Sequence, residues 1–220
     1  MPSRSDLKAV RAIVFDVFGT LAEIGEKRRP YAQLLQFMRE AGREPQPDDA
    51  ALLMSANVGL AGVPSLFGKE LPIESIAALE LDLYAELSTI KLYPEVAYTL
   101  TALRNAGYKI GLCSNLAAPY AVPIKFLLPF ELDAYAWSFE VGAVKPDPAI
   151  YEQICAGLAC VPSEVIMIGD TLEADYAGPR CMGMHGFHLD RKGDSPVEEN
   201  LKTLDEILSL LDRLDFIVPT

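Results

Sequence analysis

The sequence predicts a doubly wound α/β fold whose central sheet is mostly parallel. Short apolar runs that end in polar residues or glycine recur along the chain, as buried parallel strands do. Segments with a helical spacing of apolar residues alternate with these runs, which is typical of a sheet covered by helices. The expected strands cover residues 12–17, 108–113, 135–139, 165–168 and 184–189. The expected helices cover residues 95–105, 148–156 and 197–211, and the first two should end at Gly107 and Gly157.

One segment interrupts this alternation directly after the first strand. Between about residues 23 and 91 no run predicts a strand, and helical patterns cover residues 31–40, 48–57 and 74–88. An insertion at this point would cover the carboxyl end of the first strand and act as a lid that excludes water; extra helices on one sheet face are the alternative. We therefore expect a Rossmann-like α/β core of residues 1–22 and 92–220 and an all-helical cap subdomain of residues 23–91.

Composition limits the class of function. The chain has 220 residues, half of them apolar, which is enough for one sizeable core. Its 19 basic and 31 acidic side chains give a net charge of -12, which would repel nucleic acid and anionic membranes. No apolar run approaches the ~18–20 residues that span a bilayer, and the spacing of the four cysteines predicts reduced core thiols rather than a metal site. We expect a cytoplasmic protein that acts on a small, anionic molecule; the oligomeric state is not readable.

Polar residues follow the first two expected strands. Asp16 lies at the carboxyl end of the first strand, where parallel sheets place their chemistry, and a carboxylate there can act as a nucleophile. Gly19 permits a sharp turn, and Thr20 offers a hydroxyl group and an N–H at the same point. Ser114 and Asn115 follow the second strand and would face the same crevice, where they can bind anionic oxygens. Each residue alone also fits a helix cap or a turn.

Two later segments complete the candidate site. Lys145 lies in a loop that Pro146 and Pro148 brace, so its charge can be aimed at clustered carboxylates; a solvated surface lysine is the alternative. Asp170 and Asp175 straddle the turn after the strand at residues 165–168, which lets both reach one hard cation. Magnesium fits best, since it prefers one or two carboxylates together with water and substrate oxygens.

In this order, the four stretches resemble the four motifs of the haloacid dehalogenase-like (HAD) hydrolase superfamily. The resemblance covers about residues 10–22 and 92–190, and the segment between them resembles that family's helical cap of the first type. It implies an α/β hydrolase in which Asp16 is the nucleophile and Ser114 and Lys145 hold the phosphoryl group. It also implies a Mg²⁺ site formed by Asp16, Asp170, the carbonyl of Phe18 and Asp175. Further substrate contacts are expected from Phe18, Gly19, Thr20 and Asn115.

Phe18 departs from the family pattern. Family phosphatases usually have Asp two residues after the nucleophile, where it protonates the leaving group and activates the hydrolytic water. A general acid–base group contributes on the order of 10²- to 10⁴-fold, so its loss predicts slow cleavage of phosphate esters unless the leaving group is good. Metal binding need not suffer, because the family uses only the backbone carbonyl at this position.

The stretch from Asp16 to Thr20 also resembles the metal-independent 2-haloacid dehalogenases of the same superfamily. Tyr151 matches a dehalogenase position, but it also fits as a packed helix aromatic. Those enzymes carry Ser and Asn near the fourth motif, where this chain has Asp170 and Leu172. The sequence therefore favours a Mg²⁺-dependent phosphohydrolase acting on a small phosphorylated compound. A dehalogenase and a weakly catalytic binding or regulatory protein are the alternatives.

Substrate choice is expected to depend on the cap. Arg28 lies soon after the nucleophile and is expected to meet an anionic substrate group, since arginine presents a two-pronged donor to carboxylate or phosphate. As part of a charged helix start, it also fits a solvated position. The segment from Gly59 to Gly68 is a candidate specificity loop, with Phe67 as an apolar contact; packing of the cap on the core explains it equally well.

Overall fold

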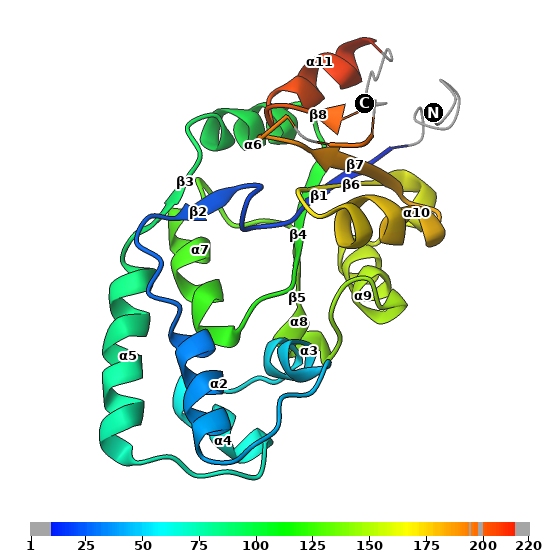
Figure 1. Ribbon diagram of the computed structural model, residues 1–220. Helices are drawn as coiled ribbons and strands as arrows, with labels where there is room; N and C mark the ends of the chain where they lie inside the picture. Colours follow the sequence, from blue (N-terminus) through cyan, green and yellow to red (C-terminus); the bar gives the residue numbers. More distant parts are fainter. Residues whose placement is uncertain (1–9, 194, 198–199, 214–220) are drawn as a thin grey trace.

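A computed structural model describes residues 10–193, 195–197 and 200–213 of the chain. Its main sheet has six strands in the order β5-β4-β1-β6-β7-β8, and every neighbouring pair is parallel. These strands are β1 (Ala12–Phe15), β4 (Lys109–Ser114), β5 (Ala134–Trp137), β6 (Val165–Gly169), β7 (His185–Leu189) and β8 (Asn200–Leu201). The doubly wound α/β fold with a mostly parallel sheet is thus confirmed (Figure 1).

Strand β1 lies in the centre of the sheet and is buried on both faces. Its four side chains have no exposed surface, and they alternate between two apolar clusters: Ile13 and Phe15 belong to one, Ala12 and Val14 to the other. In register, Phe15 is opposite Leu112 of β4 and Ile168 of β6. The amide of Asp16 continues the ladder by donating to the carbonyl of Ile168 at 2.9 Å. Residue 16 therefore leaves the sheet beside the ends of β4 and β6.

Helices cover both faces of the sheet. Helix α9 (Pro148–Leu158) packs on β4 and β5 and buries Ile150 and Ile154 in the cluster that contains Val14. The other helices of this part of the chain are α6 (Val96–Asn105), α7 (Ala121–Leu127), α8 (Ser138–Val141), α10 (Gly178–Cys181) and α11 (Glu206–Arg213), with single turns at η2 (Ala118–Tyr120) and η3 (Pro162–Glu164) and a π-helix, η4 (Leu172–Ala177).

The end of α9 corrects one expectation. The helix continues past Gly157 and ends at Leu158, and the residue after it, Ala159, has a left-handed φ of 49°. Gly157 lies inside the helix, where it faces β5. A Cβ at this position would come within 3.0 Å of the Cβ of Ala134, so the glycine permits close packing of α9 on β5. Gly107, with φ of 87°, follows α6 as expected.

The segment after β1 is mainly helical, as expected, but it is bounded by a second sheet. Strand β2 (Ala22–Ile24) pairs antiparallel with β3 (Ile90–Leu92), so the expectation of no strand in residues 23–91 was wrong. Three residues are too few to show an alternating pattern. Between these strands lie α2 (Pro30–Glu40), α3 (Asp49–Ser55), η1 (Leu60–Gly62), α4 (Val63–Leu66) and α5 (Ile73–Leu87).

Figure 1 shows α2 to α5 grouped at the lower left, with β2 and β3 where the chain enters and leaves the group. Buried side chains of α2 and α5, such as Leu34 and Leu83, belong to the same apolar cluster as Ile13 of the main sheet. The division into a core and a cap stays a prediction. The segment from Gly59 to Gly68 is not an open loop, because η1 and α4 occupy most of it.

Two further expectations need correction. Residues 197–211 do not form one helix: β8 pairs with β7, Leu201 lying opposite Leu189, and α11 starts only at Glu206. All four cysteines are free, but Cys181 is exposed rather than in the core. Among the helices of the described ranges, none combines the length and apolar character needed to cross a bilayer.

Candidate active site

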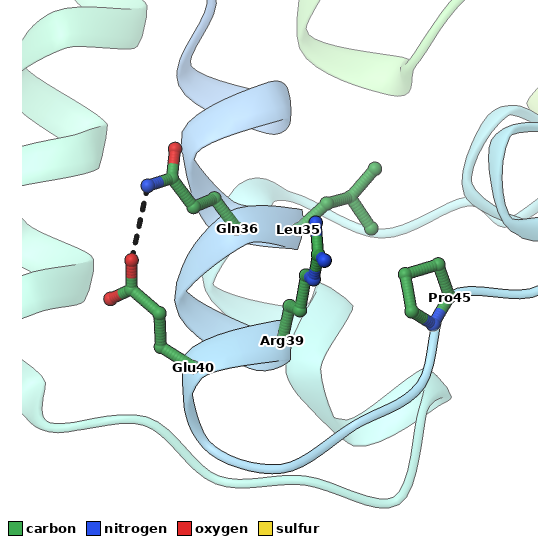
Figure 2. A pocket seen from close by; sticks show the side chains of 5 residues that line it. All are labelled: Leu35, Gln36, Arg39, Glu40 and Pro45. Atoms are coloured by element: carbon green, nitrogen blue, oxygen red, sulfur yellow. Dashed lines mark hydrogen bonds between the residues drawn. The ribbon is translucent and has the colours of Figure 1, made fainter.

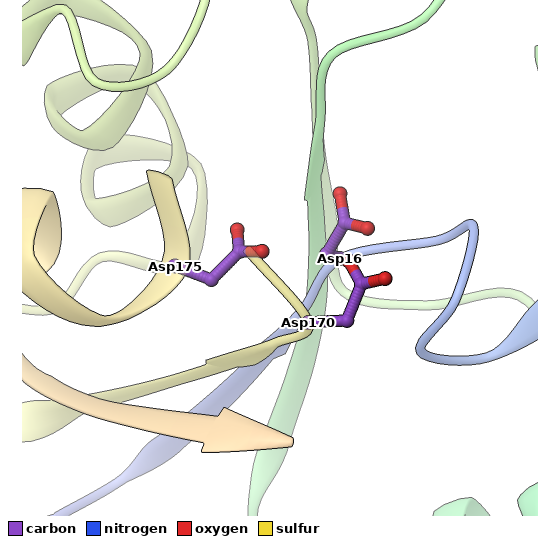
Figure 3. A group of neighbouring side chains, drawn as sticks. All are labelled: Asp16, Asp170 and Asp175. Atoms are coloured by element: carbon purple, nitrogen blue, oxygen red, sulfur yellow. The ribbon is translucent and has the colours of Figure 1, made fainter. Parts of the chain in front are cut away.

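Carboxyl groups from three segments meet at the carboxyl ends of β1 and β6. Asp16 follows β1, Asp170 follows β6, and Asp175 comes from the π-helix η4. Each offers one oxygen atom such that the three oxygens lie within 4.8 Å of one another. Figure 3 shows the three side chains at the point where the two strands end. Asp16 and Asp175 are buried, and Asp170 is exposed, so the group is open to solvent at Asp170.

Lys145 joins two of these carboxylates. Its Nζ donates to Oδ1 of Asp16 at 2.8 Å and to Oδ1 of Asp175 at 2.6 Å, and only 2% of its side chain is exposed. Asn115 fixes the lysine backbone by a reciprocal pair: its Nδ2 donates to the carbonyl of Lys145 at 2.9 Å, and its Oδ1 accepts from the lysine N–H at 2.7 Å. The Asn115 side chain thus orients Lys145, while its contact with substrate stays a prediction.

The loop after Asp16 turns back tightly on itself. Ser114, at the end of β4, donates from Oγ to the same Oδ1 of Asp16 at 2.9 Å. Gly19 has a φ of 84°, and a Cβ there would overlap the carboxylate of Asp170. Thr20 is fully buried, and its Oγ1 has no hydrogen-bond partner among the described residues. Glycine is therefore needed at position 19 both for the turn and for the approach of Asp170.

Phe18 takes part in an aromatic cluster. Its ring meets the ring of Tyr120 edge to face, with centroids 5.7 Å apart, and Tyr120 in turn lies 6.0 Å from the ring of Tyr31 on α2. Phenylalanine carries no proton that it could donate to a leaving group at this position. The apolar contact instead fixes the ring between the nucleophile loop and the helical segment.

The loop after β6 holds Asp175 against the sheet. The backbone N–H of Thr171 donates to Oδ2 of Asp175 at 3.0 Å, and a Cβ at Gly169 would overlap that carboxylate. Tyr151 of α9 donates its hydroxyl to the carbonyl of Ala174 at 2.6 Å. Tyr151 is thus a packed aromatic that supports η4, which agrees with one of the two interpretations of its position.

The electrostatics favour an additional positive charge. Burial alone would lower the pKa of Lys145, but Asp16 and Asp175 outweigh burial and raise that pKa, so the ammonium form is stable. Burial raises the pKa of Asp175 to about 6, although Lys145 opposes the shift. Desolvation and the charge of Asp16 raise the pKa of Asp170 as well. One ammonium group faces three carboxyl groups, so the set of oxygens fits a hard divalent cation.

Arg28 and a hollow on α2 are not part of the group formed by the acidic trio and Lys145. Arg28 pairs with Asp82 at 3.0 Å and with Glu26 at 2.9 Å, and its binding to substrate stays a prediction. A hollow of about 560 Å³ on α2 is lined by Leu35, Gln36, Arg39, Glu40 and Pro45 (Figure 2). Gln36 and Glu40 bond to each other across one helical turn at 3.0 Å. None of the acidic trio lines this hollow, and we assign it no role.

Sequence reasoning missed two residues at the far edge of the site: one contacts the loop after β6, and the other supports the nucleophile loop. His188 of β7 contacts the carbonyl of Asp170 through Nε2 at 3.0 Å. Arg191 donates to the carbonyls of Gly19 and Thr20. No spacing in the sequence links Arg191 to Gly19, which lies 172 positions away. The pairing of β7 with β6 and of β6 with β1 brings the two residues together.

Comparisons with known proteins identify the family of the chain. A family model described as haloacid dehalogenase-like hydrolase matches residues 10–183. The chain is 24% identical to a glyceraldehyde 3-phosphate phosphatase of Methanothermobacter thermautotrophicus, over 90% of this chain and 100% of the relative. It is 26% identical to (S)-2-haloacid dehalogenase 1 of a Pseudomonas species, over 93% of this chain and 98% of the relative.

Solved structures show the same fold. A HAD phosphatase from Thermococcus onnurineus matches with a TM-score of 0.65 at 24% identity, over 92% of this chain and 98% of that one. A 2-haloacid dehalogenase from Pseudomonas syringae matches with a TM-score of 0.63 at 17% identity, over 93% of this chain and 99% of that one. Both kinds of enzyme thus share the architecture.

Proposed function

The chain belongs to the haloacid dehalogenase-like hydrolases, and we propose that within this family it is a Mg²⁺-dependent phosphohydrolase of a small phosphorylated compound. The observation that carries the proposal is the acidic trio of Asp16, Asp170 and Asp175, whose oxygens lie within 4.8 Å of one another. A dehalogenation that forms its ester at carbon needs no metal beside the nucleophile. Two further carboxylates beside it make physical sense when a cation balances them.

Asp16, Asp170, Asp175 and the backbone carbonyl of Phe18 are the groups that would hold the ion. All are hard oxygen donors, as Mg²⁺ prefers, and Asp170 is exposed, so waters or substrate oxygens can complete the coordination. When bound, Mg²⁺ supplies positive charge that offsets the carboxylates and the phosphate oxygens.

We assign the nucleophilic attack to Oδ2 of Asp16, because the hydrogen bonds of Ser114 and Lys145 both go to Oδ1. A bond forms between Oδ2 and phosphorus as the bond from phosphorus to the ester oxygen breaks, which gives an aspartyl-phosphate and an alcohol. Water then attacks phosphorus, and the bond to Oδ2 breaks to release phosphate. Ser114 and Lys145 hold the carboxylate in place and face the phosphoryl oxygens.

Phe18 limits the compounds that this site cleaves quickly. The Phe18 side chain cannot protonate the leaving oxygen, and we assign this proton to water. We therefore expect rates to depend strongly on the pKa of the leaving alcohol, with activated aryl phosphates cleaved fastest. The same absence slows the attack of water on the aspartyl-phosphate.

The helical segment of residues 23–91 completes the proposal as a cap over the site. The two strands β2 and β3 form its connection, and the bond from Oγ of Ser138 in α8 to the carbonyl of Met54 in α3, at 2.6 Å, joins its far side to the core. A closed cap excludes water from the nucleophile during the first step. Among candidate substrates, glyceraldehyde 3-phosphate deserves the first trial, because two phosphatases of that name align over 90% and 83% of the chain.

The test is hydrolysis of an activated aryl phosphate and of glyceraldehyde 3-phosphate, each with Mg²⁺ and with EDTA. We expect phosphate release that needs Mg²⁺ and that falls by at least about 10³-fold in Asp16→Asn, which keeps the shape but removes the nucleophile. Phosphate release that persists in EDTA or in the Asp16→Asn variant would contradict the proposal.

A metal-independent 2-haloacid dehalogenase is the second candidate, and Phe18 is the observation that favours it. An ester formed at carbon needs no acid at position 18, since halide leaves without a proton. The same assay distinguishes the candidates when 2-chloropropionate is included: halide release in EDTA that requires Asp16 would establish the dehalogenase.

A further inference from the structure

A small cavity of about 130 Å³ lies on the Asp170 side of the acidic trio. Its lining includes Gly19 from the nucleophile loop, Tyr93 and the segment that follows β7. One side chain of this segment, Arg191, crosses from the last part of the sheet to the loop after Asp16. The sequence motifs do not include it.

Arg191 makes four contacts at once. Its Nε donates to the carbonyl of Gly19 at 3.1 Å, and its Nη2 donates to the carbonyl of Thr20 at 2.7 Å. Nη2 also pairs with Oε1 of Glu95 at 2.6 Å, and the guanidinium lies 3.8 Å from the centroid of the Tyr93 ring. Glu95 and Tyr93 therefore fix the planar fork, and the fork binds two successive backbone carbonyls.

The loop that receives these bonds is held mainly by its own backbone and, at its end, by the N–H of Tyr93, which donates to the carbonyl of Leu21 at 3.0 Å. The N–H groups of Thr20, Leu21 and Ala22 all donate to the carbonyl of Val17, and the N–H of Gly19 donates to the carbonyl of Ala22. Because these three N–H groups share a single acceptor, a displacement of the Val17 carbonyl would weaken all three hydrogen bonds. Arg191 is the side chain that ties the outer carbonyls of this turn to a different part of the sheet.

We propose that Arg191 is a positioning residue that fixes the nucleophile loop and thereby holds the Asp16 carboxylate and the Phe18 carbonyl in register with Asp170. The inference deepens the proposed function and rests on it, because the loop matters through Asp16. Arg191 does not touch the reacting atoms in this account. A lysine cannot replace it fully, since a single ammonium lacks the flat fork that reaches both carbonyls.

The first test measures hydrogen exchange and does not depend on turnover. In Arg191→Met, which keeps the aliphatic stem but removes the donors, we expect the amides of residues 19–22 to exchange about tenfold faster than in the unmodified protein. Arg180→Met is the matched control, because Arg180 also donates Nε to a backbone carbonyl, that of Gly186 at 3.0 Å, and also stacks on a tyrosine, Tyr176.

The Arg180→Met control should leave exchange at residues 19–22 unchanged. Unchanged exchange in Arg191→Met, or equal acceleration in Arg180→Met, would overturn the inference. This result is independent of the proposed function: a protein with no phosphatase activity but with faster exchange in Arg191→Met would refute the activity and support the positioning role.

Kinetics give the second test. We expect Arg191→Met to lower kcat about tenfold with KM nearly unchanged, and Arg191→Lys to recover only part of the loss. Arg180→Met should keep the kcat of the unmodified enzyme. Full recovery by lysine would show that charge rather than the two-pronged bond matters, and it would overturn the inference.

Discussion

At the scale of single residues, Phe18 is the side chain that most separates this protein from the family pattern. Its ring packs on Tyr120 at the side of the nucleophile loop, where a phosphatase of the family would carry its acid. The position is half-buried, so a polar side chain can be placed there without being enclosed on all sides. Position 18 is thus the place where catalysis should be most open to improvement.

We expect Phe18→Asp to raise kcat/KM for an alkyl phosphate by about 10²-fold, because it supplies the missing general acid. The gain should be small for an activated aryl phosphate, whose leaving group needs no proton. The melting temperature should fall, because the contact with Tyr120 is lost. Phe18→Asn is the matched control, with similar shape and no acid. Equal rates for the two variants would refute the role of position 18.

The shifted carboxyl groups predict how the protein responds to pH. Burial raises the pKa of Asp175 from 3.8 to about 6, so the folded protein binds more protons than the unfolded chain between these values. The contribution of this group to stability therefore decreases as pH rises through that window. The raised pKa of Asp170 acts in the same direction.

Mg²⁺ should reverse this loss, because it binds the deprotonated carboxylates. We expect Mg²⁺ to raise the melting temperature by several degrees at about pH 7.5 and much less at about pH 5. The Asp170→Asn variant should reduce the effect at the higher pH. Thermal denaturation followed by circular dichroism measures both, and a shift of equal size at the two pH values would contradict the assignment of the ion to this trio.

At the scale of elements, one buried carboxylate joins the helical segment to the main sheet. Glu86, in the last turn of α5, accepts from the hydroxyl of Tyr120 at 2.6 Å and from the backbone N–H of Arg29 at 2.7 Å. Arg29 precedes α2 and has a left-handed φ of 57°, which is costly for a residue with a side chain. The bond to Glu86 therefore stabilises this conformation as well as the junction.

A double-mutant cycle tests the junction. Tyr120→Phe should lower the free energy of unfolding by about 1–3 kcal/mol, since it leaves one oxygen of Glu86 buried without a donor. Glu86→Gln should cost a similar amount, and the double variant should cost less than the sum, because both variants alter the same junction. Tyr108→Phe is the control: the Tyr108 hydroxyl is buried without a partner among the described residues, so its removal should be nearly neutral. Additive effects would contradict the coupling.

The long, periodic elements are those that the sequence allows one to predict. Burial gives β1, β4 and β6 continuous apolar runs, and it gives α2, α5 and α6 apolar residues at helical spacing. Both patterns can be recognised in the sequence without knowledge of the partners. Strands β2, β3 and β8 have two or three residues each, so their existence depends on a pairing partner rather than on a local pattern. The π-helix η4 depends likewise on Asp175, whose carboxylate accepts from the N–H of Thr171.

At the scale of the whole molecule, the parallel sheet brings the site together. Ser114 and Lys145 are 98 and 129 residues from Asp16 in sequence, yet both bond to one oxygen of its carboxylate. This meeting could be predicted, because parallel strands end at one edge of the sheet. The support from Arg191 could not, since nothing in the local sequence distinguishes it from a surface arginine.

The substrate also could not be predicted, for a physical reason. Arg28, the expected anion contact, is held by Asp82 and Glu26, and these ion pairs come from elements whose approach depends on the tertiary fold. The side chains of the central site could be predicted because a few polar residues follow the strands in a fixed order along the sequence. The choice of substrate depends on many contacts between the helical segment and the sheet.

In the proposed mechanism Asp16 becomes phosphorylated during turnover, and the mass of the peptide that contains Asp16 reports this modification. Because the Phe18 side chain cannot activate water, the second step should be slow and the aspartyl-phosphate should accumulate. Acid quenching during steady-state cleavage of an aryl phosphate with Mg²⁺ should then add one phosphoryl group to the Asp16 peptide, and none in EDTA. An unmodified Asp16 peptide during active phosphate release, or a phosphoryl group on another residue, would contradict the account.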